Sequence, residues 1–236
     1  MGSNLRILYF GFYNPDYSRN RVLISGLKEN GVQVIECQIS GKSNFRFLRL
    51  LIKYLIMWPS FDLMMVGFSG QEVMFLARWL TFKPIIFDAF TSHYAGYILD
   101  RQYFSKNSWH AHYYRFLDRW SCRLANLVLL DTQAHINFFI KEFGLSPNKF
   151  RRVFVGTDAS FEDFKHESNS SVDSKVLFFG TFIPLQGVDV ILRAAKILES
   201  KSIKFEIIGN GQEKKKALML AQELGLKNVI FTDMVS

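Results

Sequence analysis

The sequence predicts an α/β fold made of two doubly wound domains with parallel sheets. Short apolar runs alternate with stretches of helical periodicity along most of the 236 residues, which is the pattern of consecutive βαβ units. One stretch rich in Ser, Asp and Glu, residues 161–174, interrupts the alternation. Apolar residues make up 49% of the chain and aromatic residues 16%, so there is material for a core on both sides of this interruption.

The first domain is predicted over residues 1–160. Its strands are the apolar runs at residues 5–9, 32–37, 63–66, 84–87, 127–130 and 152–155. Its helices are the segments between them, near residues 20–30, 45–57, 71–81, 109–124 and 133–143. Because a helix separates each pair of successive strands, we expect the strands to run parallel.

A linker is predicted over residues 161–174 and a second domain over residues 175–236. Residues 176–179 are continuously apolar, as expected for a strand that is covered on both faces. Two further strands are predicted at residues 205–208 and 229–231.

Glycine residues follow two strands of the second domain. Gly180 ends the first strand, and Gly187 opens a helix whose apolar positions recur three and four residues apart. The next strand runs directly into Gly209-Asn210-Gly211. Such glycines, placed between a parallel strand and a helix N-terminus, let backbone N–H groups approach a phosphate. Because Asn-Gly is a common turn pair, a plain turn is the alternative at residues 209–211.

The second domain contains, in order, VLFFG, PLQG, VDVILRAAKIL, FEIIGNGQ, LGL and VIF. This order resembles the start of the donor-binding domain of GT-B glycosyltransferases, and within that fold the retaining family known as family 4 or group 1. Residues 1–160 resemble the matching N-terminal domain. The resemblance implies two Rossmann-like domains and a sugar transfer from a nucleotide diphosphate sugar to an acceptor hydroxyl. It further implies retention of configuration, without a metal ion or other cofactor.

The resemblance assigns donor binding to both glycine loops, at Gly180, Thr181, Gln186, Gly187, Gly209, Asn210 and Gly211. Thr181 and Gln186 stand where the family usually carries an Arg and a Lys that bind the donor diphosphate. These side chains can hydrogen-bond a phosphate but supply no charge, so we expect weaker stabilisation of the diphosphate.

The family also carries a pair of glutamates eight positions apart that contacts the donor, followed by a last helix. Neither occurs in this sequence, so we expect the second domain to be incomplete. The alternative function is therefore a non-catalytic or half-site chain. Such a chain would bind acceptor or membrane and would need a second polypeptide to complete the donor site.

Loops that follow strands of the first domain supply further candidates. Arg19 and Arg21 lie where the first helix begins, and a cation there opposes the helix dipole. They are candidates for contact with phosphate or acceptor, with a solvated surface as the alternative. His93 follows the fourth strand, where the resemblance implies a catalytic His that hydrogen-bonds the sugar. Asp88 is expected to orient this ring or to bind acceptor, and an exposed loop His is the alternative.

Asp131 and Thr132 follow the fifth strand. The resemblance places this strand end beside the acceptor, so both residues are candidates for acceptor contact. Either side chain would also serve as an ordinary cap for the next helix.

Positive charge is concentrated in the first domain. The net charge is +8; residues 1–160 carry 19 Lys and Arg against 11 Asp and Glu, and the other residues carry 10 of each. Residues 45–58 place Arg46, Arg49 and Lys53 on one face of an otherwise apolar helix. This pattern predicts contact with an anionic membrane surface, although a helix packed on a sheet would show the same stripe.

The acceptor is accordingly expected to be a glycan or a lipid-linked molecule. Nucleic-acid binding is not expected, because the aromatic residues follow core-like periodicity rather than a basic stripe. Cys37 and Cys122 show no metal or redox spacing, which favours buried thiols in a reducing compartment. With no signal-peptide pattern at the start, we expect a cytoplasmic protein, located at the inner face of the membrane if residues 45–58 bind lipid.

Overall fold

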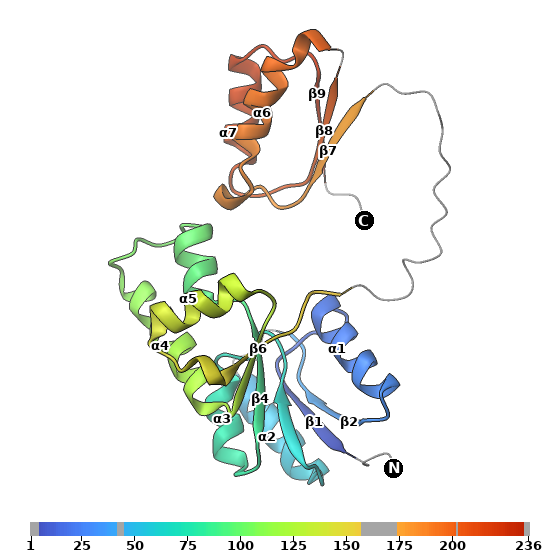
Figure 1. The fold of residues 1–236 in the computed structure, drawn as a ribbon, viewed down its shortest axis with the longest axis vertical. Coiled ribbons are helices and arrows are strands. Elements are labelled where there is room, and N and C mark those ends of the chain that lie inside the picture. Colours follow the sequence, from blue (N-terminus) through green and yellow to red (C-terminus); the bar gives the residue numbers. More distant parts are fainter. Residues whose placement is uncertain (1–4, 42–44, 157–173, 202, 234–236) are drawn as a thin grey trace. The chain divides into compact units, whose positions relative to one another are not determined.

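The computed structural model describes residues 5–41, 45–156, 174–201 and 203–233 (Figure 1). The predicted linker, residues 161–174, lies outside the described residues except for Ser174. The chain divides into two compact units. The first holds Met1–Gly96 and Phe104–Phe164, and the second holds Lys165–Ser236 with the short stretch Tyr97–Tyr103.

A six-stranded parallel sheet forms the centre of the first unit, in the order β2-β1-β3-β4-β5-β6. Its strands are β1 (Arg6–Gly11), β2 (Gln33–Gln38), β3 (Leu63–Val66), β4 (Ile85–Phe90), β5 (Leu127–Leu130) and β6 (Phe150–Arg152). The helices between them are α1 (Ser18–Glu29), α2 (Arg46–Met57), α3 (Val73–Leu80), α4 (Trp109–Leu124) and α5 (Gln133–Phe143). A π-helical segment, Ala95–Asp100, lies between β4 and α4.

The strand order assigns the helices to the two faces of this sheet. Across the sheet, β2 lies on one side of β1, and β3 to β6 follow in sequence order on the other side. Since parallel crossovers are right-handed, α1 covers one face and α2 to α5 cover the other. Side chains on the α2 to α5 face are fully buried: Leu8, Phe10, Met64, Val66, Ile85, Phe87, Val128 and Leu130.

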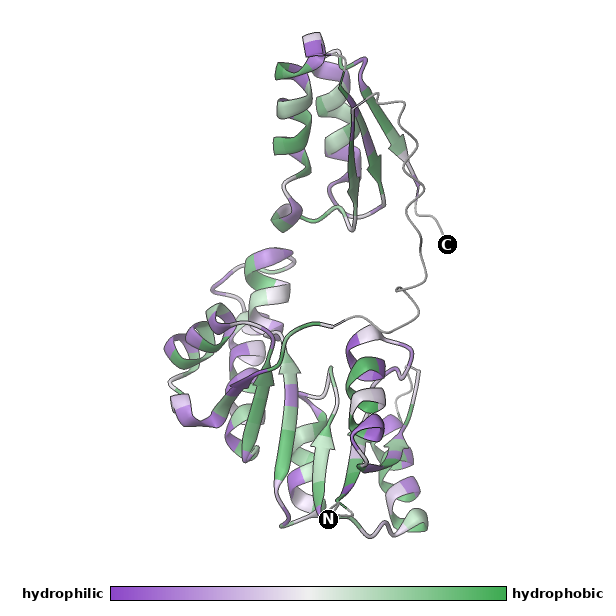
Figure 2. Ribbon diagram, turned by 45° about the vertical axis from the view of Figure 1, so that its right-hand side comes forward, coloured by the Kyte–Doolittle hydropathy of each residue, from purple (hydrophilic) through white to green (hydrophobic). Residues whose placement is uncertain are grey.

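The second unit is a three-stranded parallel sheet in the order β7-β8-β9. Its elements are β7 (Lys175–Phe179), α6 (Val188–Ile197), β8 (Lys204–Ile208), α7 (Lys214–Glu223) and β9 (Val229–Thr232). Phe182, Val188, Leu192, Ile207 and Ala217 form its core. Figure 2 shows that the strands of both sheets are predominantly apolar, as buried parallel strands are expected to be.

The structure corrects the prediction that residues 176–179 are covered on both faces. In β7, Leu177 is 54% exposed and Phe179 is 77% exposed. Both helices of the unit pack on the other face of the sheet, against Phe178, Ile207 and Phe231. The apolar run is real, but among the described residues no element covers its second face.

One predicted strand of the first domain is also displaced. The sequence favoured residues 152–155, whereas β6 begins at Phe150, which pairs with Val128 of β5. Phe150 is buried against Phe139 of α5, with ring centroids 6.0 Å apart, so packing decides where the strand starts. No helix within the described residues is long and apolar enough to cross a membrane.

Candidate functional site

The candidate residues of the first unit gather at one edge of its sheet. In doubly wound sheets, ligands bind beyond the carboxyl ends of the strands. There, residues 12–17 connect β1 to α1, residues 91–94 follow β4, and residues 131–132 follow β5. The six predicted residues lie in these loops or next to them: Arg19, Arg21, Asp88, His93, Asp131 and Thr132.

Arg19 and Asp88 form a buried ion pair at this edge. The Arg19 guanidinium donates from Nη2 to Asp88 Oδ1 at 2.8 Å and from Nε to Oδ2 at 3.1 Å. Arg19 is 4% exposed and Asp88 is fully buried. Burial raises the pKa of the Asp88 carboxyl, and the guanidinium opposes this rise. The pair joins the first turn of α1 to the end of β4.

The remaining Arg19 donor also has partners, so its predicted role needs correction. Nη1 donates to the carbonyl oxygens of Val153 and Phe154, at 2.9 and 3.2 Å. Arg19 is therefore a buried structural cation rather than the surface guanidinium that the sequence suggested for a phosphate. Arg21 lies exposed and donates to the Asp16 carbonyl at 3.1 Å, and its contact with phosphate or acceptor stays a prediction.

A carboxylate that the sequence analysis did not single out, Asp118 of α4, holds the loop of His93. Its oxygens accept hydrogen bonds from Ser92 Oγ at 2.7 Å, from His93 N at 3.1 Å and from Tyr94 N at 2.8 Å. Asp118 is fully buried, and burial raises the pKa of its carboxyl to about 6, against the opposing effect of these hydrogen bonds. The sequence assigned the orienting role to Asp88, whereas Asp88 pairs with Arg19.

A signal for Asp118 was present in the sequence. It stands on the helix face that Leu117, Ser121 and Cys122 share, and that face is buried. An acidic residue on a buried helical face requires hydrogen-bond partners, and here three donors of one loop supply them.

His93 itself is only partly exposed. Burial lowers the pKa of its imidazole to about 4, so the ring is neutral at physiological pH. Its ring packs edge-on against Tyr114, with centroids 6.2 Å apart. A neutral imidazole has one nitrogen that donates a hydrogen bond and one that accepts, so it can hydrogen-bond a hydroxyl group. It carries no positive charge that would attract an anion.

Asp131 and Thr132 begin α5. The Thr132 hydroxyl accepts from His135 N at 3.1 Å and so caps the helix. The Asp131 carboxylate lies 2.5 Å from His135 Nδ1. Asp131 also raises the pKa of Asp88 through its negative charge, which places the two carboxylates in one electrostatic environment. Contact of either residue with acceptor stays a prediction.

In the second unit, the two glycine loops are bound to each other through their backbones. Gly180 N donates to Ile208 O at 3.0 Å, and Phe182 N donates to Asn210 O at 2.9 Å. A Cβ at Gly209 would lie 1.9 Å from the Gly180 carbonyl oxygen, and one at Gly211 would lie 2.6 Å from the Phe182 carbonyl oxygen. Both glycines also have φ near +150°, at +141° and +153°. These positions therefore require glycine for packing alone.

The side chains predicted for donor binding differ in their exposure. Thr181 and Gln186 are exposed, and Gly187, with φ +61°, ends a short turn and begins α6. The Asn210 side chain accepts from Gly211 N at 2.8 Å. A cation that the sequence analysis did not assign lies beside this loop: Lys214 Nζ donates to Gly209 O at 3.1 Å and pairs with Asp233.

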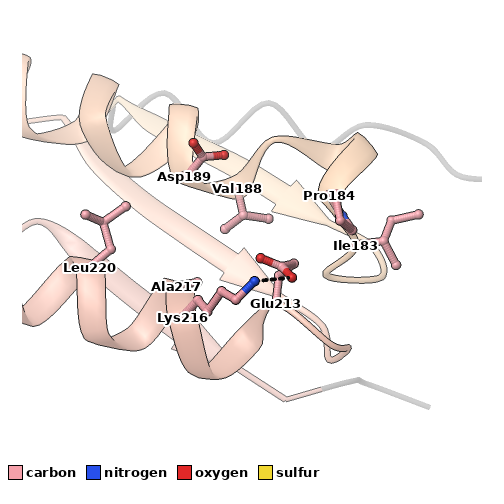
Figure 3. A pocket seen from close by; sticks show the side chains of 8 residues that line it. All are labelled: Ile183, Pro184, Val188, Asp189, Glu213, Lys216, Ala217 and Leu220. Carbon is pink, nitrogen blue, oxygen red and sulfur yellow. Dashed lines mark hydrogen bonds and ion pairs between the residues drawn. The ribbon is translucent and has the colours of Figure 1, made fainter. Parts of the chain in front are cut away.

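The second unit also contains a cavity of about 280 Å³ between the starts of α6 and α7 (Figure 3). Its carboxylates are Asp189 and Glu213, and its one cation, Lys216, is paired with Glu213 at 3.0 Å. Two carboxylates against one paired cation disfavour a diphosphate. None of the predicted donor-binding residues lines this cavity, and donor binding at the glycine loops stays a prediction.

Comparison with known proteins provides a direct indication of chemistry in the second unit. Residues 160–236 match the family model described as glycosyl transferases group 1. This segment includes both glycine loops and both helices that follow them. A search of curated proteins finds no match.

Solved structures share the architecture at low sequence identity. HepE of Anabaena in complex with UDP superposes with a TM-score of 0.64 at 16% identity, over 98% of this chain and 70% of that chain. The glycosyltransferase WaaG, involved in lipopolysaccharide biosynthesis, gives 0.58 at 15% identity, over 98% and 70%. UDP-GlcNAc 2-epimerase from Neisseria meningitidis, bound to UDP-GlcNAc, gives 0.56 at 14% identity, over 98% and 73%.

The fold is GT-B. An epimerase shares it, so the fold alone does not separate sugar transfer from epimerisation. The match to group 1 glycosyl transferases makes that distinction, and together the two findings support a glycosyltransferase.

Within the described residues, no group of three or more His, Cys, Asp or Glu side chains is arranged to hold a metal ion.

Proposed function

We propose that this chain transfers a sugar from a nucleotide diphosphate sugar to an acceptor hydroxyl, with retention at the anomeric carbon and without a metal ion. The observation that carries the proposal is the match of residues 160–236 to group 1 glycosyl transferases. Both loops proposed to bind donor, residues 180–187 and 209–211, lie in that segment.

The donor diphosphate would be bound largely by neutral groups and by the start of α7. Thr181 and Gln186 can donate hydrogen bonds to phosphate oxygens. Lys214 and Lys215 open α7, and their charges add to the positive end of the helix dipole. The two structural neighbours with UDP or UDP-GlcNAc bound make uridine nucleotides the first donors to test.

The proposed reaction is a front-face displacement. The bond between the anomeric carbon and the donor phosphate oxygen breaks, and a bond from the acceptor oxygen forms on the same face. The acceptor proton passes to the leaving phosphate, which serves as the base. His93 is proposed to hydrogen-bond the sugar as a neutral imidazole, in keeping with its pKa of about 4, while Asp118 fixes the loop that carries it.

We propose a glycan or lipid-linked acceptor on the side of the first unit. This proposal is supported by the excess positive charge of residues 1–160 and by the basic side chains of α2. A lipid-linked acceptor would bring residues 45–58 to an anionic membrane. Both described cysteines are buried free thiols, and we propose a cytoplasmic location at the inner membrane face.

The first experiment is calorimetric titration of the whole chain with UDP, GDP and their sugar conjugates at matched salt. The proposal would be supported if one nucleotide binds with micromolar affinity. Its sugar conjugate should then release the free nucleotide when acceptor is added. Binding of UDP-GlcNAc with interconversion of the sugar and no transfer would identify an epimerase instead. Absence of nucleotide binding by the folded chain would refute autonomous transfer.

The exposed face of the second sheet favours one alternative. Leu177, Phe179 and Ile230 are 54%, 77% and 59% exposed, and alternation along the strands places them on the face opposite α6 and α7. A parallel sheet is normally covered on both faces. A chain that needs a second polypeptide segment to complete its donor site would present such a surface. Sugar transfer by the chain alone would exclude this alternative.

A further inference from the structure

The strand order of the first sheet singles out one place at its carboxyl edge. β1 lies between β2 and β3, and right-handed crossovers place α1 and α3 on opposite faces of the sheet. The loops that follow β1 and β3, residues 12–17 and 67–72, therefore leave the sheet toward opposite faces. In open parallel sheets, ligands bind beyond the strand ends where two such loops diverge.

Three aromatic rings from separate segments meet at this place. Tyr17 of the first loop lies 5.5 Å from Phe68 of the second, centroid to centroid. Phe68 packs edge-on against Phe90 at the end of β4, with centroids 5.1 Å apart. Tyr17 is 41% exposed, and Phe68 and Phe90 are partly exposed. The three rings are thus open to solvent rather than enclosed in the core, which is typical of a surface that binds a ligand.

The backbone at the end of β4 is bent where Phe90 joins these rings. The pairing with β5 shifts between Asp88 and Phe90, so that Ala89 is an extra residue in the ladder. Phe90 has φ +56°, a left-handed conformation that is rare for phenylalanine, and Thr91 N donates to the Ala89 carbonyl at 2.6 Å across it. Bulges and strained residues of this kind concentrate at functional sites, where they re-aim a side chain.

The buried ion pair of the first unit supports the Phe90 ring. The Arg19 guanidinium lies 5.0 Å from the centre of this ring and is itself held by Asp88 at 2.8 Å. Arg19 therefore contributes to the site through an aromatic ring, although its donors are already used within the protein. A ring that is fixed before the ligand arrives loses little conformational entropy on binding.

The segments that carry the three rings are neutral or weakly acidic. They contain no Lys or Arg: residues 12–17, 67–72 and 89–94. Their carboxylates are Asp16 and Glu72, and Glu72 is paired with Arg46 of α2. An anionic ligand would meet no attracting charge in these segments, whereas an uncharged ring with hydroxyl groups requires none.

We propose that Tyr17, Phe68 and Phe90 form the subsite for an uncharged pyranose ring of the acceptor. A pyranose presents an apolar face of C–H groups that packs on aromatic rings, and its hydroxyl groups bond to polar groups at the edge. Ser69 follows Phe68 and is exposed, so its hydroxyl is one such group. The inference rests on the proposed sugar transfer and narrows its acceptor to a glycan whose bound sugar carries no charge.

A nucleotide base is the other ring that stacks on aromatic side chains. It fits this place less well, because a nucleoside diphosphate would bring its phosphates beside segments that contain Asp16 and no cation. Both loops proposed to bind the donor lie in the second unit, at residues 180–187 and 209–211. A sugar of the acceptor is therefore the occupant that we test.

The test is ligand-detected NMR of the whole chain in the absence of nucleotide. The probes are methyl β-D-glucopyranoside, methyl β-D-galactopyranoside, methyl β-D-glucuronide and sorbitol. We expect at least one neutral glycoside to bind, with the strongest saturation transfer to C–H groups on one face of its ring. The glucuronide should bind about fivefold more weakly or worse, because its carboxylate meets Asp16, and sorbitol, which has no ring, should not bind.

Tyr17 and Phe68 are the rings to change. Tyr17→Leu and Phe68→Leu keep apolar volume but remove the aromatic faces, so each should weaken glycoside binding about fivefold or more. Tyr17→Phe keeps the ring and should retain binding. The matched control is Phe82→Leu, because Phe82 is fully exposed and lies in the connection from α3 into β4, at the opposite edge of the sheet. Unchanged urea midpoints would show that the losses do not come from misfolding.

Four results would overturn the proposal: no binding by either neutral glycoside, equally tight binding of the glucuronide, parent-level binding by both leucine variants at Tyr17 and Phe68, or an equal loss in Phe82→Leu. Uridine is titrated against the same variants. Uridine binding that Tyr17→Leu weakens, without any glycoside binding, would assign the rings to the nucleotide base and reject the acceptor subsite.

These measurements use no nucleotide, so they separate the subsite from the proposed transfer. Nucleotide binding and sugar transfer by a chain that binds no glycoside would reject the aromatic subsite alone. Glycoside binding that depends on Tyr17, in a chain that binds no nucleotide, would support the subsite and reject autonomous transfer.

Discussion

The Arg19–Asp88 pair gives a sharp test of how the candidate site is held together. Replacing Asp88 by Asn keeps the volume and removes the charge, so the Arg19 guanidinium is left buried without its counter-ion. The two side chains are 3% and 0% exposed, so water cannot take the place of the carboxylate.

The expected loss of stability follows from these contacts. Removing one partner of a buried pair costs about 3–5 kcal/mol. Arg19 would keep the carbonyl oxygens of Val153 and Phe154 as acceptors, and the Asn amide oxygen remains an acceptor. We therefore expect the lower end of that range, about 3 kcal/mol.

Urea unfolding of the whole chain, followed by tryptophan fluorescence, measures this loss in the appropriate part of the molecule. All four tryptophans, Trp58, Trp79, Trp109 and Trp120, lie in the first unit. The control is Lys28→Met, which removes a pair with Glu36 whose side chains are 51% and 33% exposed; its cost should be below about 1 kcal/mol.

A loss of stability for Asp88→Asn as small as that for Lys28→Met would refute the reasoning. The single variant Arg19→Met and the double variant Arg19→Met with Asp88→Asn add a second check. If the charges are coupled, the double variant should be more stable than the sum of the two single losses predicts.

Three further predictions concern the loops. Gly209→Ala should abolish nucleotide binding and lower the melting temperature, because its Cβ would lie 1.9 Å from the Gly180 carbonyl oxygen. Gly225→Ala is the control: Gly225 has φ +60° and nothing within 4 Å of its added Cβ, so nucleotide binding and melting temperature should change only slightly. Asp118→Asn should shift the His93 ring signals in a proton–nitrogen NMR spectrum and reduce turnover, since it disturbs three hydrogen bonds of that loop; unchanged signals would reject the positioning role. The pKa of His93 falls from 6.5 to about 4 on folding, so the folded chain binds fewer protons between these values. Stability should decline as pH drops through this window, by at most about 3 kcal/mol, and His93→Gln should remove that part of the slope in urea titrations at several pH values.

Much of the fold could be predicted from periodicity because both sheets are parallel. Helices predicted at residues 109–124 and 133–143 coincide with α4 and α5, and strands predicted at 63–66 and 127–130 coincide with β3 and β5. Buried parallel strands appear in sequence as short apolar runs, and their crossover helices as apolar stripes. Local pattern was sufficient for these elements.

The candidate site was harder to predict, since its contacts join residues far apart in sequence. Arg19 and Asp88 are 69 positions apart, and Asp118 lies 25 positions from His93. A sequence pattern shows that a charged residue occupies a strand end or a helix face, but not which opposite charge it meets. For that reason Arg19 was predicted to contact phosphate or acceptor, and the orienting carboxylate was sought at Asp88.

Exposure was the other property that periodicity could not supply. The run at residues 176–179 has the composition of a strand buried on both faces, yet Phe179 is 77% exposed. Residues 45–57 have the stripe of a helix packed on a sheet, yet only Leu50 of α2 is buried. In both cases the pattern identified the element, and only the arrangement of its neighbours determined how much of it is covered.

These two exposed surfaces are both apolar, but their charges point to different partners. On the second sheet, Lys175 pairs with Glu206 at 2.9 Å beside Leu177, and residues after 160 carry equal numbers of basic and acidic side chains. The surface of α2 carries Arg46, Arg49 and Lys53 and no carboxylate of its own, and one of these cations, Arg46, pairs with Glu72 at the start of α3. Salt therefore separates them: screening weakens attraction between exposed charges, whereas burial of apolar surface is not weakened by it. Lipid binding through the first unit should decline steeply as salt rises, and association of a polypeptide with Leu177 and Phe179 should persist. If vesicle binding instead persists at high salt and disappears in Leu177→Ser with Phe179→Ser, the two surfaces have been assigned the wrong way round.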